Sequence, residues 1–472
     1  MPCHETTRRD FLRAGLAGAG GALVAGRRGA VAAPAVLKNR PPNLLLVICD
    51  QLGLDAIGAH GCADVQTPNL DRLIGRGTSF LESHSASPVC SPARSSLMTG
   101  RMPVETGVVS NGRPIHPSRP NLGQWFTEQG YAAVYCGKWH LPGGIPRPDD
   151  GFRVLPARGG YGQIDDSVLS HTCEAFLRNG GGDRPLLLVA SFLQPHDICY
   201  YGNHPGQRMP NGLPYEQIRE QLPELPPNHE VRPRAPAALD RLVCDWYDAE
   251  QWRYYLYLYA RMVEMLDADV GRLFDAVEDS HPAGDTVILF TSDHGDGRGR
   301  HSHVSKWYPY DEAAKVPLIA CCPERIAAGR RDSEHLVSGL DVMPTLCDFA
   351  GIKPPEGVQG SSLRPLLEGN SAPWREFVCS EHHIVGRMVR SERFKYVRYP
   401  DDPVEQLFDM QSDPWETKNL YDDGQYAGVL ADHRKMLADF RQRLDPVEPT
   451  GRPPAPKRTR PAARRQPGTG EG

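Results

Sequence analysis

The chain has 472 residues and a formal net charge of −5, with 24% charged and 40% hydrophobic residues. This length can hold one large core with a smaller domain, or two to three domains, and the composition is that of a globular protein. The acidic balance excludes broad electrostatic capture of a polyanion such as a nucleic acid, so an anionic ligand must be held locally.

Residues 1–33 are typical of an export signal. Arg8 and Arg9 are followed by a weakly apolar run of alanine and glycine, with small residues near Ala33. The pattern resembles a twin-arginine signal, which a receptor reads and which is then removed. We therefore expect transport by the twin-arginine machinery to the periplasm or the extracellular space. A membrane anchor is the alternative, but the run is short and rich in glycine.

Four near-continuous apolar runs, separated by helical stretches, predict a mostly parallel sheet covered by helices on both faces. The first run extends from Leu44 to Cys49, and the others lie in GYAAVYCGKWHL, RPLLLVASFLQPHD and DTVILFTSDHGDG. A polar residue after one strand is more often a helix cap or a turn residue, but all four runs end in this way. Ligands of open α/β sheets bind beyond the carboxyl ends of the strands. If the strands are neighbours, one pocket receives Asp50, Lys138, His140, His196, Asp293 and His294.

The segment PVCSPARSSLMTGR, residues 88–101, predicts a helix that begins near Cys90. Pro92 suits a first helical turn, and Gly100 marks the end of the helix. The Cys90 thiol would then lie at a helix N-terminus, where negative charge is stabilised. A buried structural cysteine is the alternative, and Cys49 and Cys136 fit that description because each ends an apolar run. The twelve cysteines match no zinc motif, and their number leaves disulfides open.

A long helix is expected from Trp252 to Phe274, where apolar residues recur at helical spacing. Its aromatic residues are interpreted as packing residues.

The predicted pocket has the donors of a divalent-cation site. Asp50 and Asp293 supply anionic oxygens, Gln51 a carbonyl oxygen, and His294 an imidazole nitrogen. Oxygen ligands favour calcium or magnesium and the histidine favours manganese, so the ion stays open. Basic side chains would surround a tetrahedral oxyanion and stabilise its charge during transfer: Arg94, Lys138, His140, His196 and Lys306.

The motifs CDQLG, CSPAR with SLMTGR, GKWHL, QPHD, TSDHGD and YPYDEAAKVPL follow one another in this order. In this series the chain resembles a type I sulfatase of the alkaline phosphatase-like superfamily, from about Asn43 to Asn419. The resemblance implies a catalytic domain over 41–370 and a small C-terminal α+β domain with an antiparallel sheet over 371–447. Residues 448–472 are rich in proline and arginine and predict a disordered tail.

The family resemblance implies that a formylglycine-generating enzyme oxidises Cys90 to formylglycine, whose hydrate attacks sulfur. Arg94 and Lys138 would then steady the formylglycine and sulfate, His140 would act as the base, and His196 and Lys306 would hold sulfate and assist the leaving oxygen. The implied metal ligands are Asp50, Gln51, Cys90, Asp293 and His294, with Ca²⁺ as the expected ion and Mn²⁺ or Mg²⁺ as alternatives.

Three alternatives stay open at this stage. Gln51 and His294 also occur in choline-sulfatase-like and phosphonate-monoester-hydrolase-like variants, so a phosphodiesterase or phosphonate monoester hydrolase is one rival, and an inactive sulfated-glycan-binding relative is another. Which of His301 and His303 faces the pocket is also open. A sulfated saccharide is the expected substrate, and residues 199–249 are expected to form a rim over the pocket.

Overall fold

The computed structural model describes residues 41–142, 144–157, 160–179, 182–202, 218–280, 285–382 and 385–451. The described residues between 41 and 451 belong to one compact unit. The expected signal and the tail beyond 451 lie outside the described residues. Among the helices of these ranges, none combines the length and the hydropathy that a membrane span requires.

The central sheet has eight strands in the order β5-β4-β6-β1-β7-β8-β2-β9. The four predicted strands β4, β6, β1 and β7 are consecutive neighbours and all parallel. Among the described strands of this sheet, only β8 runs the other way, since it pairs antiparallel with β7 and with β2. The remaining pairs of this sheet are parallel, so the predicted mostly parallel sheet is confirmed. In sheet order, the strands span Arg153–Val154, Ala132–Gly137, Leu186–Pro195, Asn43–Asp50, Thr286–Ser292, Leu318–Cys321, Thr78–Phe80 and Arg330–Asp332.

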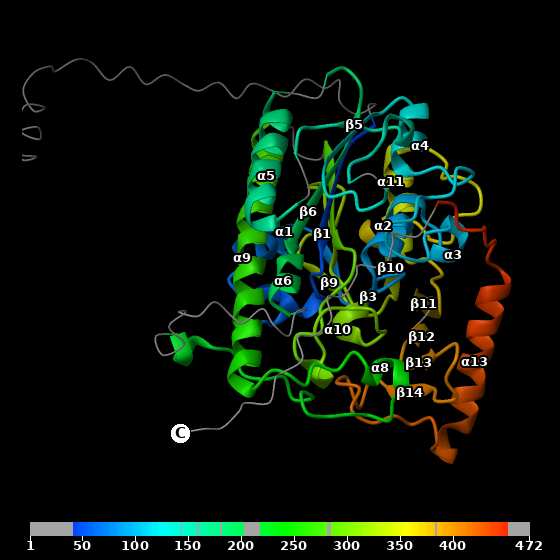
Figure 1. The fold of residues 1–472 in the computed structure, drawn as a ribbon. Coiled ribbons are helices and arrows are strands. Elements are labelled where there is room, and N and C mark those ends of the chain that lie inside the picture. Colours follow the sequence, from blue (N-terminus) through cyan, green and yellow to red (C-terminus); the bar gives the residue numbers. More distant parts are fainter. Residues whose placement is uncertain are drawn as a thin grey trace, which may run out of the picture. The chain divides into compact units, whose positions relative to one another are not determined.

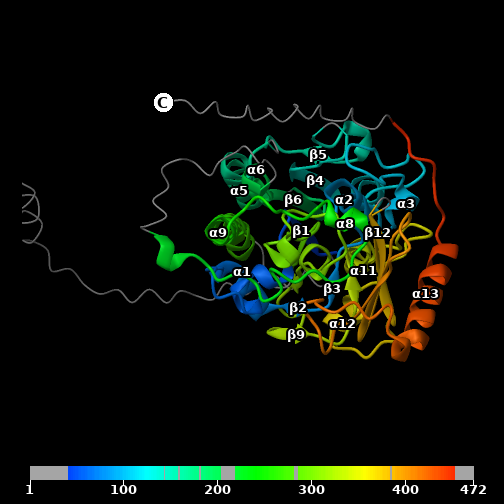
Figure 2. The same ribbon diagram turned by 60° about the horizontal axis from the view of Figure 1, so that its bottom comes forward.

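Helices cover both faces of this sheet (Figures 1 and 2). One face carries α1 (Pro68–Arg76), α5 (Gly162–Arg178) and α9 (Ala249–Ser280). The other carries α2 (Cys90–Thr99), α4 (Leu122–Glu128) and α11 (Val342–Ala350). Leu45 and Val47 of β1 point into the first core and Leu44 and Leu46 into the second, which explains why the strand is apolar without alternation.

Short elements complete this part of the fold. A two-stranded sheet pairs β3 (Ser83–His84) with β10 (Val337–Ser338). The short helices are α3 (Pro103–Thr106), α6 (Cys199–Gly202), α8 (Ala237–Asp240), α10 (Asp311–Ala314) and α12 (Arg364–Leu367).

A second sheet is antiparallel and lies toward the C-terminus. It contains β11 (Phe377–His382), β12 (Gly386–Ser391), β13 (Phe394–Arg398) and β14 (Gln406–Asp409). Helix α13 (Ala427–Gln442) packs along it, as Figure 1 shows in red. The small antiparallel sheet is therefore confirmed, whereas the domain limits at 370 and 447 stay predictions.

The cysteines of the described residues are all free thiols. Cys49 and Cys136 are fully buried, as their places at the ends of apolar runs predict. The long helix α9 is likewise confirmed, and Trp252, Tyr255 and Tyr259 are buried within its packed face.

Candidate active site

The ends of the four parallel strands bring the predicted polar residues together. Asp50 is the last residue of β1, and Asp293 directly follows β7, whose Ser292 pairs with Cys49. His196 follows β6, and Lys138 follows β4. Because these strands are neighbours, the convergence expected from the sequence is present in the structure.

Cys90 is the first residue of α2, as the sequence predicts, and Gly100 ends the helix with φ of 65°. The thiol is 1% exposed, and its Sγ lies 3.0 Å from His294 Nε2 and 3.8 Å from Asp50 Oδ1. Helix α2 therefore places the Cys90 side chain against the polar residues at the strand ends, which together form the floor of the site.

The donor set at this floor fits a divalent cation. Donor atoms of Asp50, Cys90, Asp293 and His294 all lie within 4.8 Å of one another, and all four residues are buried. The Nδ1 atom of His294 is 2.8 Å from the Gly295 carbonyl, to which it donates, so the lone pair of Nε2 faces the cluster. Two carboxylate oxygens and one imidazole nitrogen around a buried point are suitable ligands for such an ion.

Arg94 forms ion pairs with both carboxylates, Asp50 and Asp293. Its Nε donates to Asp293 Oδ2 at 2.8 Å and its second terminal nitrogen to Asp50 Oδ2 at 3.2 Å. The other terminal nitrogen donates to the Lys138 carbonyl at 2.9 Å and to Ser191 Oγ at 2.7 Å. Arg94 is 1% exposed, so most of its donors are committed to the protein. Ser191 lies inside an apolar run and gave no signal in the sequence.

Gln51 has a second set of partners beside the cluster. Its Oε1 accepts a hydrogen bond from Lys306 Nζ, and its Nε2 donates to Asp296 Oδ2 at 2.5 Å. Cys199 Sγ lies 3.2 Å from the same Nε2 and 3.6 Å from Lys306 Nζ. The Gln51 amide therefore holds Lys306 in place, and its assignment as a metal ligand stays a prediction.

Asp296 and Cys199 were missed by the sequence reasoning, although Asp296 stands within the TSDHGD motif. Tyr255 of α9 donates to Asp296 at 2.9 and 3.0 Å, and Tyr259 donates to the Gln51 carbonyl at 2.8 Å. These tyrosines pack as predicted, and in addition they fasten the floor of the site to α9.

The His196 side chain contacts Cys90, and the His140 carbonyl accepts a hydrogen bond from Ser91, the residue after Cys90; both histidines are partly exposed. In both rings Nδ1 is buried and lacks a hydrogen-bond partner within the described part of the chain. Burial, together with Lys306 and Lys138, lowers the pKa of His196 to about 4, so this ring is neutral at pH 7. Two imidazoles with unused nitrogen atoms can serve an oxyanion ligand.

The electrostatics of the site favour negative charge at Cys90. Burial and Asp50 oppose ionisation of this thiol, but Lys306, His294 and Lys138 bring its pKa well below the usual range. Burial also opposes ionisation of Asp50, but Lys138 and other cationic neighbours hold its pKa well below the usual range. Burial and Asp50 raise the pKa of Asp293 to about 6.

The sequence left open which of His301 and His303 faces the pocket; within the described residues, the contacts of both rings are with supporting segments and not with Cys90. His301 Nδ1 lies 2.9 Å from the Val231 carbonyl, and its Nε2 lies 3.1 Å from Asn228 Nδ2. The His303 ring lies 4.5 Å from the ring of Tyr308. Both histidines are buried, and they pack within the segment that carries Lys306.

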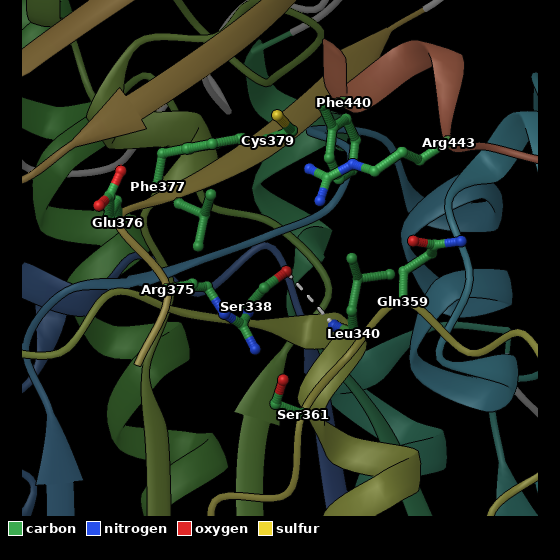
Figure 3. A pocket seen from close by; sticks show the side chains of 11 residues that line it. Ser338, Leu340, Gln359, Ser361, Arg375, Glu376, Phe377, Cys379, Phe440 and Arg443 are labelled. Atoms are coloured by element: carbon green, nitrogen blue, oxygen red, sulfur yellow. Dashed lines mark hydrogen bonds between the residues drawn. The ribbon is translucent and has the colours of Figure 1, made fainter. Parts of the chain in front are cut away.

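A separate cavity of about 290 Å³ lies between β11, the end of α13 and the segment near Ser338 (Figure 3). Arg375 lines it, but its terminal nitrogens donate to Asp341 at 2.5 and 3.0 Å. Because this charge is already paired, Arg375 is not a free cation for a ligand in this cavity.

The sheet order and the site place the protein in the alkaline phosphatase-like superfamily. The family model described as "Sulfatase" matches residues 42–352, and one described as "N-sulphoglucosamine sulphohydrolase, C-terminal" matches residues 299–443. The chain belongs to the sulfatase family and is a sulfuric ester hydrolase.

Three relatives illustrate the similarity. A Delta 4,5-hexuronate-2-O-sulfatase of Bacteroides thetaiotaomicron is 33% identical over 454 residues, which cover 87% of this chain and 91% of the relative. A solved 2-O GAG sulfatase is 32% identical with a TM-score of 0.76, covering 86% of this chain and 92% of the other. The phosphonate monoester hydrolase of Agrobacterium radiobacter is 25% identical with a TM-score of 0.71, covering 88% and 100%.

Proposed function

We propose that the enzyme hydrolyses sulfate monoesters through a formylglycine that a formylglycine-generating enzyme makes from Cys90. The observation that carries the proposal is the position of Cys90 at the start of α2, 3.0 Å from His294 and close to Asp50. A buried floor that stabilises negative charge at this atom suits an oxygen nucleophile formed there.

The chain's own residues take distinct parts in this proposal. Lys138 and Lys306 stabilise the sulfate oxygens, and Arg94 orients the carboxylates of Asp50 and Asp293. His140 and His196 are the candidates for the base and for the donor to the leaving oxygen, because each has an unused buried nitrogen.

We propose Ca²⁺ as the resident ion, held by Asp50, Asp293, His294 and the modified Cys90, with Gln51 as a further candidate ligand. The bound ion would supply positive charge that polarises the sulfate ester. Elemental analysis of the purified protein, followed by chelation and re-addition of Ca²⁺, Mn²⁺ or Mg²⁺, tests the assignment. His294→Asn is expected to keep activity and shift the preference toward Ca²⁺, since a carbonyl oxygen replaces nitrogen. Full activity of metal-free enzyme contradicts the proposal.

As substrate we propose a saccharide that carries a 2-O-sulfated uronic acid. The support is the relative named for that activity, which matches nearly the whole length of both chains. Sulfate release should be measured on 2-O-sulfated unsaturated uronate, on 6-O-sulfated glucosamine and on choline sulfate, and phenol release on an aryl phosphonate monoester. The uronate should be turned over with the highest kcat/KM. A preference for the phosphonate would instead favour the rival suggested by the Agrobacterium enzyme.

Cys90→Ala should fold but lose all turnover on this panel. Cys62→Ser is the control, because Cys62 is a free thiol that lies outside the site; it is partly buried, whereas Cys90 is buried. Equal activity of Cys90→Ala and Cys62→Ser would contradict the assignment of the nucleophile.

We also propose that the protein is exported by the twin-arginine machinery to the periplasm or beyond. The support is the sequence around Arg8 and Arg9. This route carries folded proteins, so Cys90 could be modified before transport. Replacing both arginines by lysine should retain the precursor in the cytoplasm, and undiminished export would contradict the proposal.

A further inference from the structure

Trp307 is an exposed aromatic residue directly beside the catalytic floor. Its neighbour Lys306 donates to Gln51, and the Trp307 backbone N–H donates to the Pro88 carbonyl at 3.1 Å, two residues before Cys90. Trp307 nevertheless remains 42% exposed. The chain therefore fixes the backbone of a large apolar residue beside the nucleophile without burying its side chain.

The backbone of Trp307 is also strained. Its φ is 97°, a region that bulky L-residues rarely adopt. Such strain persists where the surrounding structure imposes it, and it gathers at binding and catalytic sites. A strained backbone combined with an exposed indole indicates a side chain that is positioned to contact a ligand.

A second aromatic surface follows Cys199, which contacts Lys306. Tyr200 follows Cys199, whose Sγ is 3.6 Å from Lys306 Nζ. Tyr200 is 39% exposed, and its ring centroid lies 5.1 Å from that of Tyr161, which is 57% exposed. Tyr161 precedes α5, and the first N–H groups of α5 bind Asp197, the residue after His196.

We propose that Trp307 is a stacking platform for the pyranose ring of the substrate, with the exposed pair Tyr161 and Tyr200 as a further aromatic surface for the saccharide. The inference rests on the proposed saccharide substrate and adds the residue that selects it. A sugar presents C–H groups on its ring faces and hydroxyl groups at its edge. The negative face of an indole attracts those C–H groups, while the polar floor receives the sulfate.

The test compares Trp307→Ala, Trp307→Phe and the control Met265→Ala, which removes another exposed apolar side chain, 40% exposed on α9. The platform predicts that Trp307→Ala raises KM for the 2-O-sulfated uronate about tenfold and leaves kcat within about twofold. Trp307→Phe should recover most of the affinity, and Met265→Ala should behave as wild type.

Inorganic sulfate provides the second readout, because it probes the floor without a sugar ring. Its inhibition constant should be the same for wild type and Trp307→Ala. An equal rise of this constant and of KM would mean that Trp307 acts through Lys306, and it would overturn the platform. An unchanged KM in Trp307→Ala would overturn it as well. Wild-type enzyme that turns over other sulfate esters but no saccharide would refute the proposed substrate and the platform together.

Discussion

Arg94 shows how one residue organises the site. Two buried carboxylates with no cation between them would repel each other and resist ionisation. Arg94 reaches Asp50 and Asp293 simultaneously, which a planar fork can do and a single ammonium cannot. Its position in C-x-P-x-R places it one helical turn after Cys90, so α2 carries both Cys90, the proposed source of the nucleophile, and the arginine that binds the carboxylates.

Arg94→Ala should lower the free energy of unfolding by about 3–5 kcal/mol, since it leaves the buried Asp293 without its cation and Asp50 with Lys138 as its remaining ion-pair partner. Turnover should be lost at the same time. Arg393→Ala is the control, because Arg393 also binds a carboxylate with two nitrogens but its side chain is 53% exposed. Urea denaturation measures both variants, and equal stability of the two would contradict this account of Arg94.

Much of the site could be predicted from the sequence, because strand ends are local features. Asp50, Lys138, His196 and Asp293 each follow an apolar run, and parallel strands deliver such residues to one edge. The contact of Gln51 with Lys306 spans 255 positions and depends on the packing of a loop, so no local pattern reveals it. Cys199 and Ser191 were missed for the same reason.

At the scale of elements, the segment from His301 to Tyr310 positions Lys306 through aromatic packing. The rings of His303 and Tyr308 lie 4.5 Å apart, and so do those of His301 and Tyr310. The sequence drew attention to both histidines as candidate site residues, yet it could not distinguish a supporting ring from a catalytic one. Among the strands, the long apolar ones were foreseen, while the short strands β2 and β9 at one end of the sheet carry too few residues for a pattern.

Burial and His301 lower the pKa of His303 to about 3. The unfolded chain binds a proton near the usual pKa of about 6.5, so His303 costs stability as the pH falls below that value. Between pH 7 and pH 5 this loss should be about 2 kcal/mol. His303→Phe keeps a ring but cannot bind a proton. In this variant the denaturation midpoint should therefore decrease less between pH 7 and pH 5 than in wild type. His171→Gln, whose side chain is 58% exposed, should leave the fall unchanged; an unaltered profile in His303→Phe would refute the argument.

At the scale of the whole molecule, the small antiparallel sheet supports the catalytic floor. Tyr308 and Tyr310 pack in one cluster with Val397 of β13 and Phe408 of β14. Lys395 of β13 is fully buried, and its Nζ lies 2.5 Å from Asp311, 2.7 Å from Glu416 and 3.2 Å from the Pro309 carbonyl. The C-terminal sheet therefore fixes the backbone three residues beyond Lys306.

Lys395→Met should destabilise the protein by about 3–5 kcal/mol, because it leaves the buried Glu416 and the partly buried Asp311 without this cation. The same change should lower kcat, since the segment that carries Lys306 loses its anchor. Lys435→Met, which removes a lysine with a 76% exposed side chain from an ion pair on α13, should change neither quantity measurably. Thermal unfolding measures the stability of both variants, and steady-state kinetics measure their kcat. Wild-type activity in Lys395→Met would show that the C-terminal sheet does not position the site.

The most direct test of the proposed chemistry is the mass of the peptide that contains Cys90. It should be measured on active enzyme purified from its own host. The account predicts a peptide about 18 Da lighter than the unmodified sequence, because an aldehyde replaces the thiol. Fully active enzyme in which Cys90 is an unaltered cysteine would contradict it.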